Sequence, residues 1–289
     1  MLFKKTTGCS KQSVVFYANS AIIMSMENLL NLLKNPGSCS RPLVMGILNI
    51  TPDSFHDGGR FFDASNAVKQ ALALAEAGAD IIDIGAASSR PGYTPVSASE
   101  ESSRLLPILD ALKDLALPPL SVDTDKLAVA EAAVGRGVSI INDTSGALDS
   151  GCFELAAANE LPLIVMHRLR KKADQDIVSE VEAFFELSLE KANISELPER
   201  LIIFDPGLGF NKSIGENLQL IDAIPRLARL GRPLLIGYSH KRVAASLTGE
   251  HPGYAPKGNA ILARRVKDLG ADIVRVHDVK EFLESIKHG

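Results

Sequence analysis

Asn49, Asp53 and Asp57 stand close together in a segment that follows an apolar run at 43–48 and ends in the glycine pair Gly58–Gly59. Amide and carboxylate oxygens in one loop can hold a cation or a polar substrate. Loops supported by a rigid sheet are where binding chemistry usually sits. An ordinary Asn/Asp/Pro/Gly turn is the alternative interpretation, and the rest of the chain is needed to decide between them.

Seven further apolar runs end in polar side chains in the same way. The polar residues at these ends include Ser89 and Arg90, Asp123, Asn142, His167, Asp205, Lys241, and the pair Arg275 and His277. Arg275 and His277 are two residues apart, so on a strand they point to the same side. This repeated pattern favours one shared site over a series of unrelated turns.

The elements between these runs have the spacing of helices. They lie at 63–77, 99–115, 125–134, 177–192, 215–230, 257–269 and 279–286, and the first is expected to be capped by Asp63. Apolar strands that alternate with helices predict a parallel sheet covered by helices, and eight such units fit a single (β/α)8 TIM barrel. A doubly wound sheet is the alternative, but it normally carries a Gly-rich phosphate turn after its first strand, and none stands there.

Composition is consistent with one large domain over residues 41–289. The chain has 289 residues, 46% of them hydrophobic, and a net charge of -4, so neither a nucleic-acid surface nor a membrane surface is implied. No apolar stretch is long enough to span a bilayer. The odd number of cysteines, without metal-type spacing, favours reduced thiols and a cytoplasmic protein.

Residues 1–40 form an N-terminal extension of different character. Lys4, Lys5 and Lys11 precede a short apolar stretch, but no sustained apolar core follows, so a signal peptide is not expected. The extension is predicted to be partly disordered or to include a short helix at 26–34, below the barrel. Met1, Met24 and Met26 are all possible translation starts.

A set of motifs in chain order resembles the dihydropteroate synthase family. They are Met45–Phe55, Ser88–Gly92, Ser121–Thr124, Ile141–Asp143, Met166–His167, Asp205–Phe210 and Arg275–Val279, within a resemblance that covers about residues 42–287. The family is a (β/α)8 barrel. It joins 6-hydroxymethyl-7,8-dihydropterin diphosphate to 4-aminobenzoate, forms dihydropteroate in folate synthesis and releases diphosphate. The resemblance also implies a homodimer.

The resemblance assigns the pterin to Asp123, Asn142 and Asp205, with Lys241 at the ring carbonyl or N5 and Met166 in the same pocket. A carboxylate that accepts two parallel N–H bonds from a guanidine-like edge makes a strong, directional pair. Capping of the following helices is the alternative for Asp123 and Asn142.

The other substrate groups and the metal are assigned by the same resemblance. Arg275 and His277 would bind the diphosphate, and Asn49 would offer one oxygen to Mg²⁺, the implied cofactor, which keeps most of its waters. In the first two loops, Asp57 would face the cation formed when diphosphate leaves. Arg90 and Pro91 would cover the diphosphate and the aminobenzoate, and Ser89 would bind substrate in the same loop.

Departures from the family pattern gather around the second substrate. Phe210 would form one wall of the aminobenzoate pocket, with ordinary core packing as the alternative. Arg242 replaces a serine that usually receives the aminobenzoate carboxylate, and His240 replaces an arginine. The second loop has Ala86–Ala87 where the family has Gly-Glu. Three functions therefore stay open: an active synthase, a pterin-binding paralogue with another acceptor or no synthase activity, and a pterin-dependent methyltransferase, ranked last.

Overall fold

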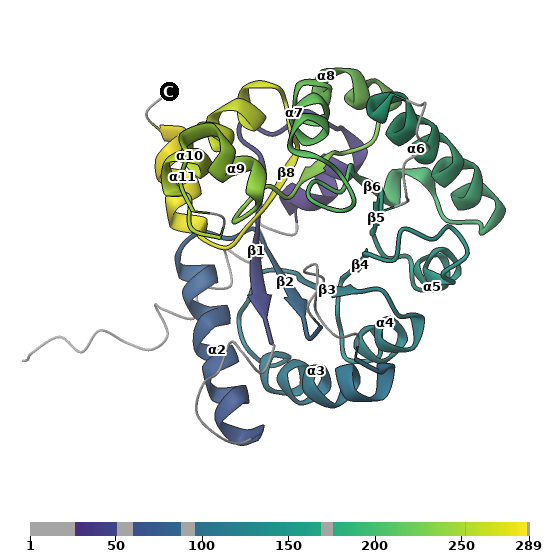
Figure 1. Cartoon of the computed structure of the whole chain (residues 1–289). Coiled ribbons are helices and arrows are strands. Elements are labelled where there is room, and N and C mark those ends of the chain that lie inside the picture. Colours follow the sequence, from purple (N-terminus) through teal and green to yellow (C-terminus); the bar gives the residue numbers. More distant parts are fainter. Residues whose placement is uncertain (1–26, 51–59, 88–95, 169–175, 252, 288–289) are drawn as a thin grey trace, which may run out of the picture.

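Eight parallel strands form a sheet that closes into a barrel, with helices around it (Figure 1). The computed structural model describes residues 27–50, 60–87, 96–168, 176–251 and 253–287. Within these ranges the strands are β1 (Leu43–Asn49), β2 (Ile81–Gly85), β3 (Leu120–Thr124), β4 (Ile140–Asp143), β5 (Leu163–Met166), β6 (Ile202–Asp205), β7 (Leu235–Ile236) and β8 (Ile273–Val276). The predicted (β/α)8 barrel is confirmed.

Hydrogen bonding runs around the barrel in the order β6-β5-β4-β3-β2-β1-β8-β7. The two ends of this order meet at a parallel bridge between Phe204 and Leu234, where the Phe204 amide donates to the Pro233 carbonyl at 2.9 Å. β7 is short, so this bridge completes the closure. Closure leaves no free strand edge.

The helices follow the strands. They are α2 (Arg60–Glu76), α3 (Ala98–Leu112), α4 (Leu127–Val134), α5 (Cys152–Asn159), α6 (Ile177–Ile194), α7 (Ile214–Asp222), α8 (Ile224–Leu227), α9 (Arg242–Thr248), α10 (Pro256–Asp268) and α11 (Val279–Lys287). No helix among the described residues is long and apolar enough to cross a membrane.

Two helix predictions need correction, and two helices were missed. α2 begins at Arg60, so Asp63 lies inside it and is not its N-cap. The helix expected at 215–230 is divided, because Pro225 near the start of α8 has no N–H to continue the ladder of α7. The short helices α5 and α9 were not predicted.

The strands are apolar because both of their faces are covered. All residues of β2, β4, β5 and β6 are buried. Outside the barrel, helices pack on the strands, and inside it side chains of different strands meet. Near-continuous apolar runs are the expected sequence of such strands. The polar residues within these runs are therefore exceptions that need an explanation.

A helix at residues 27–34 precedes β1. Its Leu29, Leu32 and Leu33 are buried in the same apolar cluster as the first residues of β1. Just after the helix, the Gly37 amide donates to Asp272 Oδ1 at 2.7 Å, next to the start of β8. The predicted short helix is confirmed, and residues 1–26 lie outside the described ranges. The boundary of the domain at residue 41 stays a prediction.

Candidate active site

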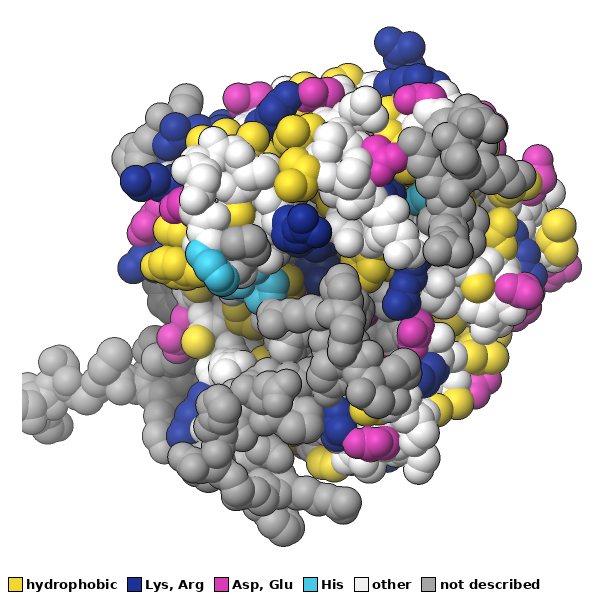
Figure 2. Space-filling view, viewed as in Figure 1, with side chains coloured by type: hydrophobic (Ala, Val, Ile, Leu, Met, Phe, Trp, Pro, Cys, Tyr) yellow, Lys and Arg dark blue, Asp and Glu magenta, His cyan; other side chains and the backbone are white. Residues whose placement is uncertain are grey.

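The polar residues at the strand ends meet at one mouth of the barrel. Figure 2, viewed as Figure 1, shows Lys and Arg side chains (dark blue) and His side chains (cyan) near the middle of this face. The carboxyl ends of parallel strands all lie on one face of such a barrel, which is where active sites form.

Arg275 on β8 binds two carboxylates inside the barrel. Its Nε donates to Asp83 Oδ2 at 2.6 Å and its Nη2 donates to Asp123 Oδ2 at 2.5 Å. Burial opposes the charge of Arg275, but the two acids more than offset this effect, and the pKa of Arg275 is raised. In this structure the guanidinium is thus bound across β2 and β3, rather than directed to the rim beside His277. Its role in diphosphate binding stays a prediction.

Asn142 on β4 extends this network. Its Nδ2 donates to Asp83 Oδ2 at 3.1 Å, while Asn142 Oδ1 and Asp83 Oδ1 are buried and have no hydrogen-bond partner. Buried acceptors without a donor are costly. A ligand that presents N–H groups here would satisfy them.

Asp123 is held by neutral and charged donors. Its Oδ1 accepts from Thr144 Oγ1 at 3.1 Å. Burial raises the pKa of Asp123 to about 6, against the opposing effect of Arg275. Neither Asp123 nor Asn142 caps a helix, because the N-caps of α4 and α5 are Lys126 and Gly151. The capping alternative is therefore wrong for both residues.

Asp205 ends β6 and shapes the turn after it. Its Oδ1 accepts from the Gly207 amide at 2.7 Å, and burial raises its pKa. Gly207 has φ +66°, and an added Cβ would lie 2.0 Å from the His167 carbonyl oxygen. Only glycine fits here, so the turn is fixed in one conformation above the carboxylate.

Lys241 and Phe210 lie side by side at the mouth. The Lys241 ammonium donates to the Leu208 carbonyl at 2.5 Å and lies 5.1 Å from the centroid of the Phe210 ring. The Arg168 guanidinium lies 5.6 Å from the same centroid. Burial lowers the pKa of Lys241 to about 8. Phe210 is only partly buried, so the alternative of ordinary core packing is not supported.

His277 is oriented by two neighbours. Its amide and its ring Nδ1 lie 3.3 and 3.2 Å from Ser239 Oγ. Its ring stacks on that of His240, with centroids 4.3 Å apart and planes at 4°. His240 has φ +57°, a left-handed conformation that is uncommon outside glycine. The chain holds these rings parallel at the rim.

The other predicted site residues are placed as follows. Met166 is buried at the end of β5 and paired in register with Asp205. Arg242 is exposed at the first position of α9. Asp57, Ser89 and Arg90 lie outside the described residues.

Asp83 and Lys212 were not predicted as site residues. A charged residue inside the apolar run Ile81–Gly85 was the available signal for Asp83, since buried carboxylates need partners. Lys212 binds the carbonyls of His167, Gly207 and Phe210 at 3.0, 3.0 and 3.1 Å. These contacts join Lys212 to the end of β5 as well as to its own turn, and no local pattern in the sequence indicates a contact of this kind.

Asn49 is the predicted protein ligand of the implied Mg²⁺. It is the last residue of β1, partly exposed and paired with Gly85. Across the described ranges, no group of three or more His, Cys, Asp or Glu side chains could hold a metal ion. A single amide oxygen fits Mg²⁺ that keeps waters and is shared with phosphate oxygens, and it does not fit an ion held by protein alone.

Comparisons with known proteins agree with this geometry. The family model described as pterin binding enzyme matches residues 45–277. A dihydropteroate synthase from Synechocystis is 39% identical over 257 residues, covering 86% of this chain and 89% of that protein. A crystal structure of dihydropteroate synthase from Clostridium difficile, in the presence of pteroic acid, has a TM-score of 0.82 at 35% identity and covers 86% and 95% of the two chains.

Some relatives are much longer. A probable bifunctional folylpolyglutamate synthase/dihydropteroate synthase from Haloferax volcanii is 46% identical over 257 residues, or 84% of this chain. The chain spans about a third of the length of the two bifunctional relatives it matches, 30% of one and 32% of the other.

Proposed function

The chain belongs to the family of pterin-binding enzymes, and from that premise we propose that it is a dihydropteroate synthase. It would condense 6-hydroxymethyl-7,8-dihydropterin diphosphate with 4-aminobenzoate and release diphosphate, in folate biosynthesis.

The observation that carries this proposal is the buried polar network of Asp83, Asp123, Asn142 and Arg275. Two of its acceptors, Asp83 Oδ1 and Asn142 Oδ1, lack a donor within the described residues. A pterin ring has a guanidine-like edge with several N–H donors, and a carboxylate–guanidine pair is directional and strong. A site with unpaired buried acceptors also discriminates against ligands that lack the matching donors.

The remaining residues have roles that follow from their positions. Asp205 would bind the pterin from β6, and the Lys241 ammonium, which donates one of its three N–H groups to the Leu208 carbonyl, would reach the ring carbonyl or N5 with another. His277, with its ring held by Ser239 and His240, would contact the diphosphate. Phe210 would cover the aminobenzoate ring.

In the proposed reaction the bond between the pterin methylene carbon and the diphosphate oxygen breaks first. The diphosphate leaves with the electron pair, and the methylene carbon becomes cationic. The aniline nitrogen of 4-aminobenzoate then attacks this carbon and loses a proton. Asp57, outside the described residues, is proposed to face the cation, and Arg90 to help exclude water, which would trap it.

Mg²⁺ is proposed as the cofactor, with Asn49 as its protein ligand. When bound, it would stabilise negative charge on the departing diphosphate. A homodimer and a cytoplasmic location are also proposed. Light scattering would give the oligomeric state. The free thiols of Cys39 and Cys152 support a reducing compartment.

A paralogue with another acceptor is the second candidate. It is favoured by the basic residues His240 and Arg242 at the mouth, which differ from the family pattern described above. A pterin-dependent methyltransferase is ranked last, because it has no need of a diphosphate site.

The test is a synthesis assay with purified protein, pterin diphosphate, 4-aminobenzoate and Mg²⁺, following dihydropteroate by mass. Formation of dihydropteroate is the expected result. Release of diphosphate without dihydropteroate, or with product only from another aniline, would favour the paralogue instead.

A further inference from the structure

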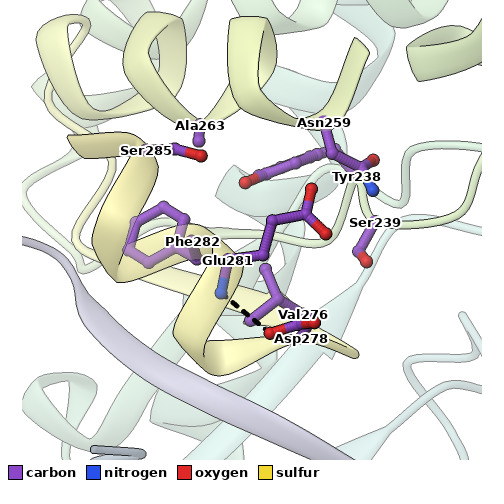
Figure 3. A pocket seen from close by; sticks show the side chains of 9 residues that line it. All are labelled: Tyr238, Ser239, Asn259, Ala263, Val276, Asp278, Glu281, Phe282 and Ser285. Atoms are coloured by element: carbon purple, nitrogen blue, oxygen red, sulfur yellow. Dashed lines mark hydrogen bonds between the residues drawn. The ribbon is translucent and has the colours of Figure 1, made fainter. Parts of the chain in front are cut away.

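A small polar cavity lies behind the barrel mouth, between α10, α11 and the segment that follows β7 (Figure 3). Tyr238, Ser239, Asn259, Asp278 and Glu281 provide its polar lining. Its volume is about 220 Å³ including the opening, with room inside for about one water-sized particle. It shares no residue with the pterin network at the centre of the barrel.

Two buried oxygens in this cavity have no donor. Asn259 is 7% exposed, and its Oδ1 has no hydrogen-bond partner. Glu281 Oε1 is also buried without a partner. Figure 3 shows the Glu281 carboxylate reaching from α11 toward the side chains of Tyr238 and Asn259. The Asn259 side chain makes a hydrogen bond to the Glu281 carboxylate, but Asn259 Oδ1 and Glu281 Oε1 stay without partners, and buried acceptors of this kind require a donor or a cation.

The charge around the cavity is negative. Burial raises the pKa of Glu281, and so do Asp278 and Glu250, while the side-chain hydrogen bond from Asn259 lowers it. Asp278 Oδ1 accepts from the Glu281 amide at 2.8 Å. The nearby Arg264 is directed to the Ser285 carbonyl, to which its Nε donates at 3.0 Å. Among the residues that the structure describes, no cationic side chain compensates Glu281.

We propose that this cavity binds one monovalent cation of the size of Na⁺ or K⁺, held between Glu281 Oε1 and Asn259 Oδ1. A hard cation prefers oxygen ligands. Of the two carboxylates in the lining, Asp278 accepts from the Glu281 amide through Oδ1, so Glu281 is the carboxylate with an unpaired buried oxygen and matches a single positive charge better than a divalent ion. The space for one water-sized particle suits a partly dehydrated alkali ion.

The site is connected to the mouth through Ser239. This residue lines the cavity, and its Oγ lies within hydrogen-bond distance of the amide and the ring Nδ1 of His277. A cation bound behind Ser239 would therefore stabilise the segment that orients His277. Binding of the cation does not depend on the proposed function, so its test needs no substrate.

The first measurement is the thermal unfolding midpoint of the wild-type protein in NaCl, KCl and choline chloride at equal ionic strength. Choline is too large for the cavity and controls for general salt effects. We expect a saturable rise of roughly 2–4 °C in NaCl or KCl over choline chloride. Equal midpoints in all three salts would overturn the proposal, and a proton on Glu281 or a turned Asn259 amide would then supply the donor.

Two variants distinguish cation binding at the proposed site from a general effect of surface charge. Glu281→Gln keeps the size of the side chain, adds an amide donor to the cavity and removes the charge, so the dependence on the cation should be lost while the protein stays folded. Glu284→Gln, at an exposed position on the same helix, should keep the full wild-type response. The same response in Glu281→Gln as in the wild type would contradict the proposed site.

A direct measurement uses wild-type crystals soaked in Tl⁺, which replaces alkali ions and scatters anomalously. We expect one anomalous peak between Glu281 and Asn259. If soaked crystals show no peak at this position, the proposal is overturned whatever the behaviour of the variants.

Discussion

Several titratable residues at the barrel mouth have pKa values that differ from the ordinary values of their side chains. Burial raises the pKa of Asp123 to about 6 and also raises that of Asp205, while it lowers the pKa of Lys241 to about 8. The pKa of each of these groups is thereby moved toward neutral pH. Such shifts are common where charge is arranged for binding or catalysis.

The lowered pKa of Lys241 predicts a pH dependence of pterin diphosphate binding. The ammonium form exists below about pH 8 and is lost above it, so the affinity should fall as the pH rises through this value. The fall should approach about tenfold per pH unit if the charge is required. Calorimetric titrations from pH 7 to 10 would measure it.

Lys241→Arg is the control for this effect, because a guanidinium stays charged throughout the range. Its affinity should be lower at pH 7 but nearly constant with pH. Burial also lowers the pKa of Lys212 to about 8, so the series is repeated with Lys212→Met. Persistence of the alkaline fall in Lys241→Arg would exclude Lys241 as its origin.

Arg242 is predicted to receive the carboxylate of 4-aminobenzoate in place of the serine of the family pattern. Arg242→Ala should raise the KM for 4-aminobenzoate by roughly tenfold, since a lost charged hydrogen bond costs about 1.5–3 kcal/mol. The KM for pterin diphosphate should hardly change. Arg229→Ala, at another exposed position, is the matched control. An unaltered KM would mean that Arg242 serves only as an exposed surface residue.

Among the elements, the turn after β6 is held by the positively charged side chain of Lys212. The Lys212 ammonium donates to the carbonyls of His167, Gly207 and Phe210. It thereby joins the end of β5 to the segment that follows Asp205. Because the Phe210 carbonyl is one of the three acceptors, the contact also restrains the backbone that carries the Phe210 ring.

Lys212→Met should therefore destabilise the protein by about 2–3 kcal/mol, because three carbonyls lose a charged donor. Urea unfolding would measure the change. Lys113→Met, at an exposed position after α3, should change stability by less than about 0.5 kcal/mol. Equal unfolding curves for the two variants would show that the carbonyls do not need the ammonium.

Strands and helices could be predicted from the sequence where the local spacing of apolar residues determines them. The eight apolar runs became strands because both faces of a barrel strand are covered, and their polar ends marked the mouth. The short helices α5 and α9 escaped prediction because seven or eight residues give little periodic signal. The division at Pro225 was missed because the apolar spacing continues across the proline, which begins a new helix there. The pairing of Arg275 with Asp83 and Asp123 joins three strands far apart in the chain, and only the closed barrel reveals it.

For the whole molecule, the helix at 27–34 is part of the barrel rather than an appendage. Leu32 is 0% exposed within the main apolar cluster, whereas Leu30 on the same helix is 47% exposed. The core of the barrel thus includes residues that precede its first strand.

A matched pair of variants tests this role. Leu32→Ala should cost about 2–4 kcal/mol, as expected for a buried leucine that leaves a cavity. Leu30→Ala should change the free energy of unfolding by less than about 0.5 kcal/mol. Chemical denaturation would give both values, and a small effect of Leu32→Ala would separate the helix from the cooperative unit.

The central claim is that the acids at the strand ends form a pterin site, and calorimetry with pterin diphosphate on Asp205→Asn tests it most directly. Asp222→Asn, an exposed aspartate paired with Arg265, is the matched control. We expect Asp205→Asn to lose affinity on the order of a hundredfold while staying folded, because an amide donor then faces the donors of the ligand. The control should bind as the wild type does. Unchanged affinity in Asp205→Asn would contradict the proposed site.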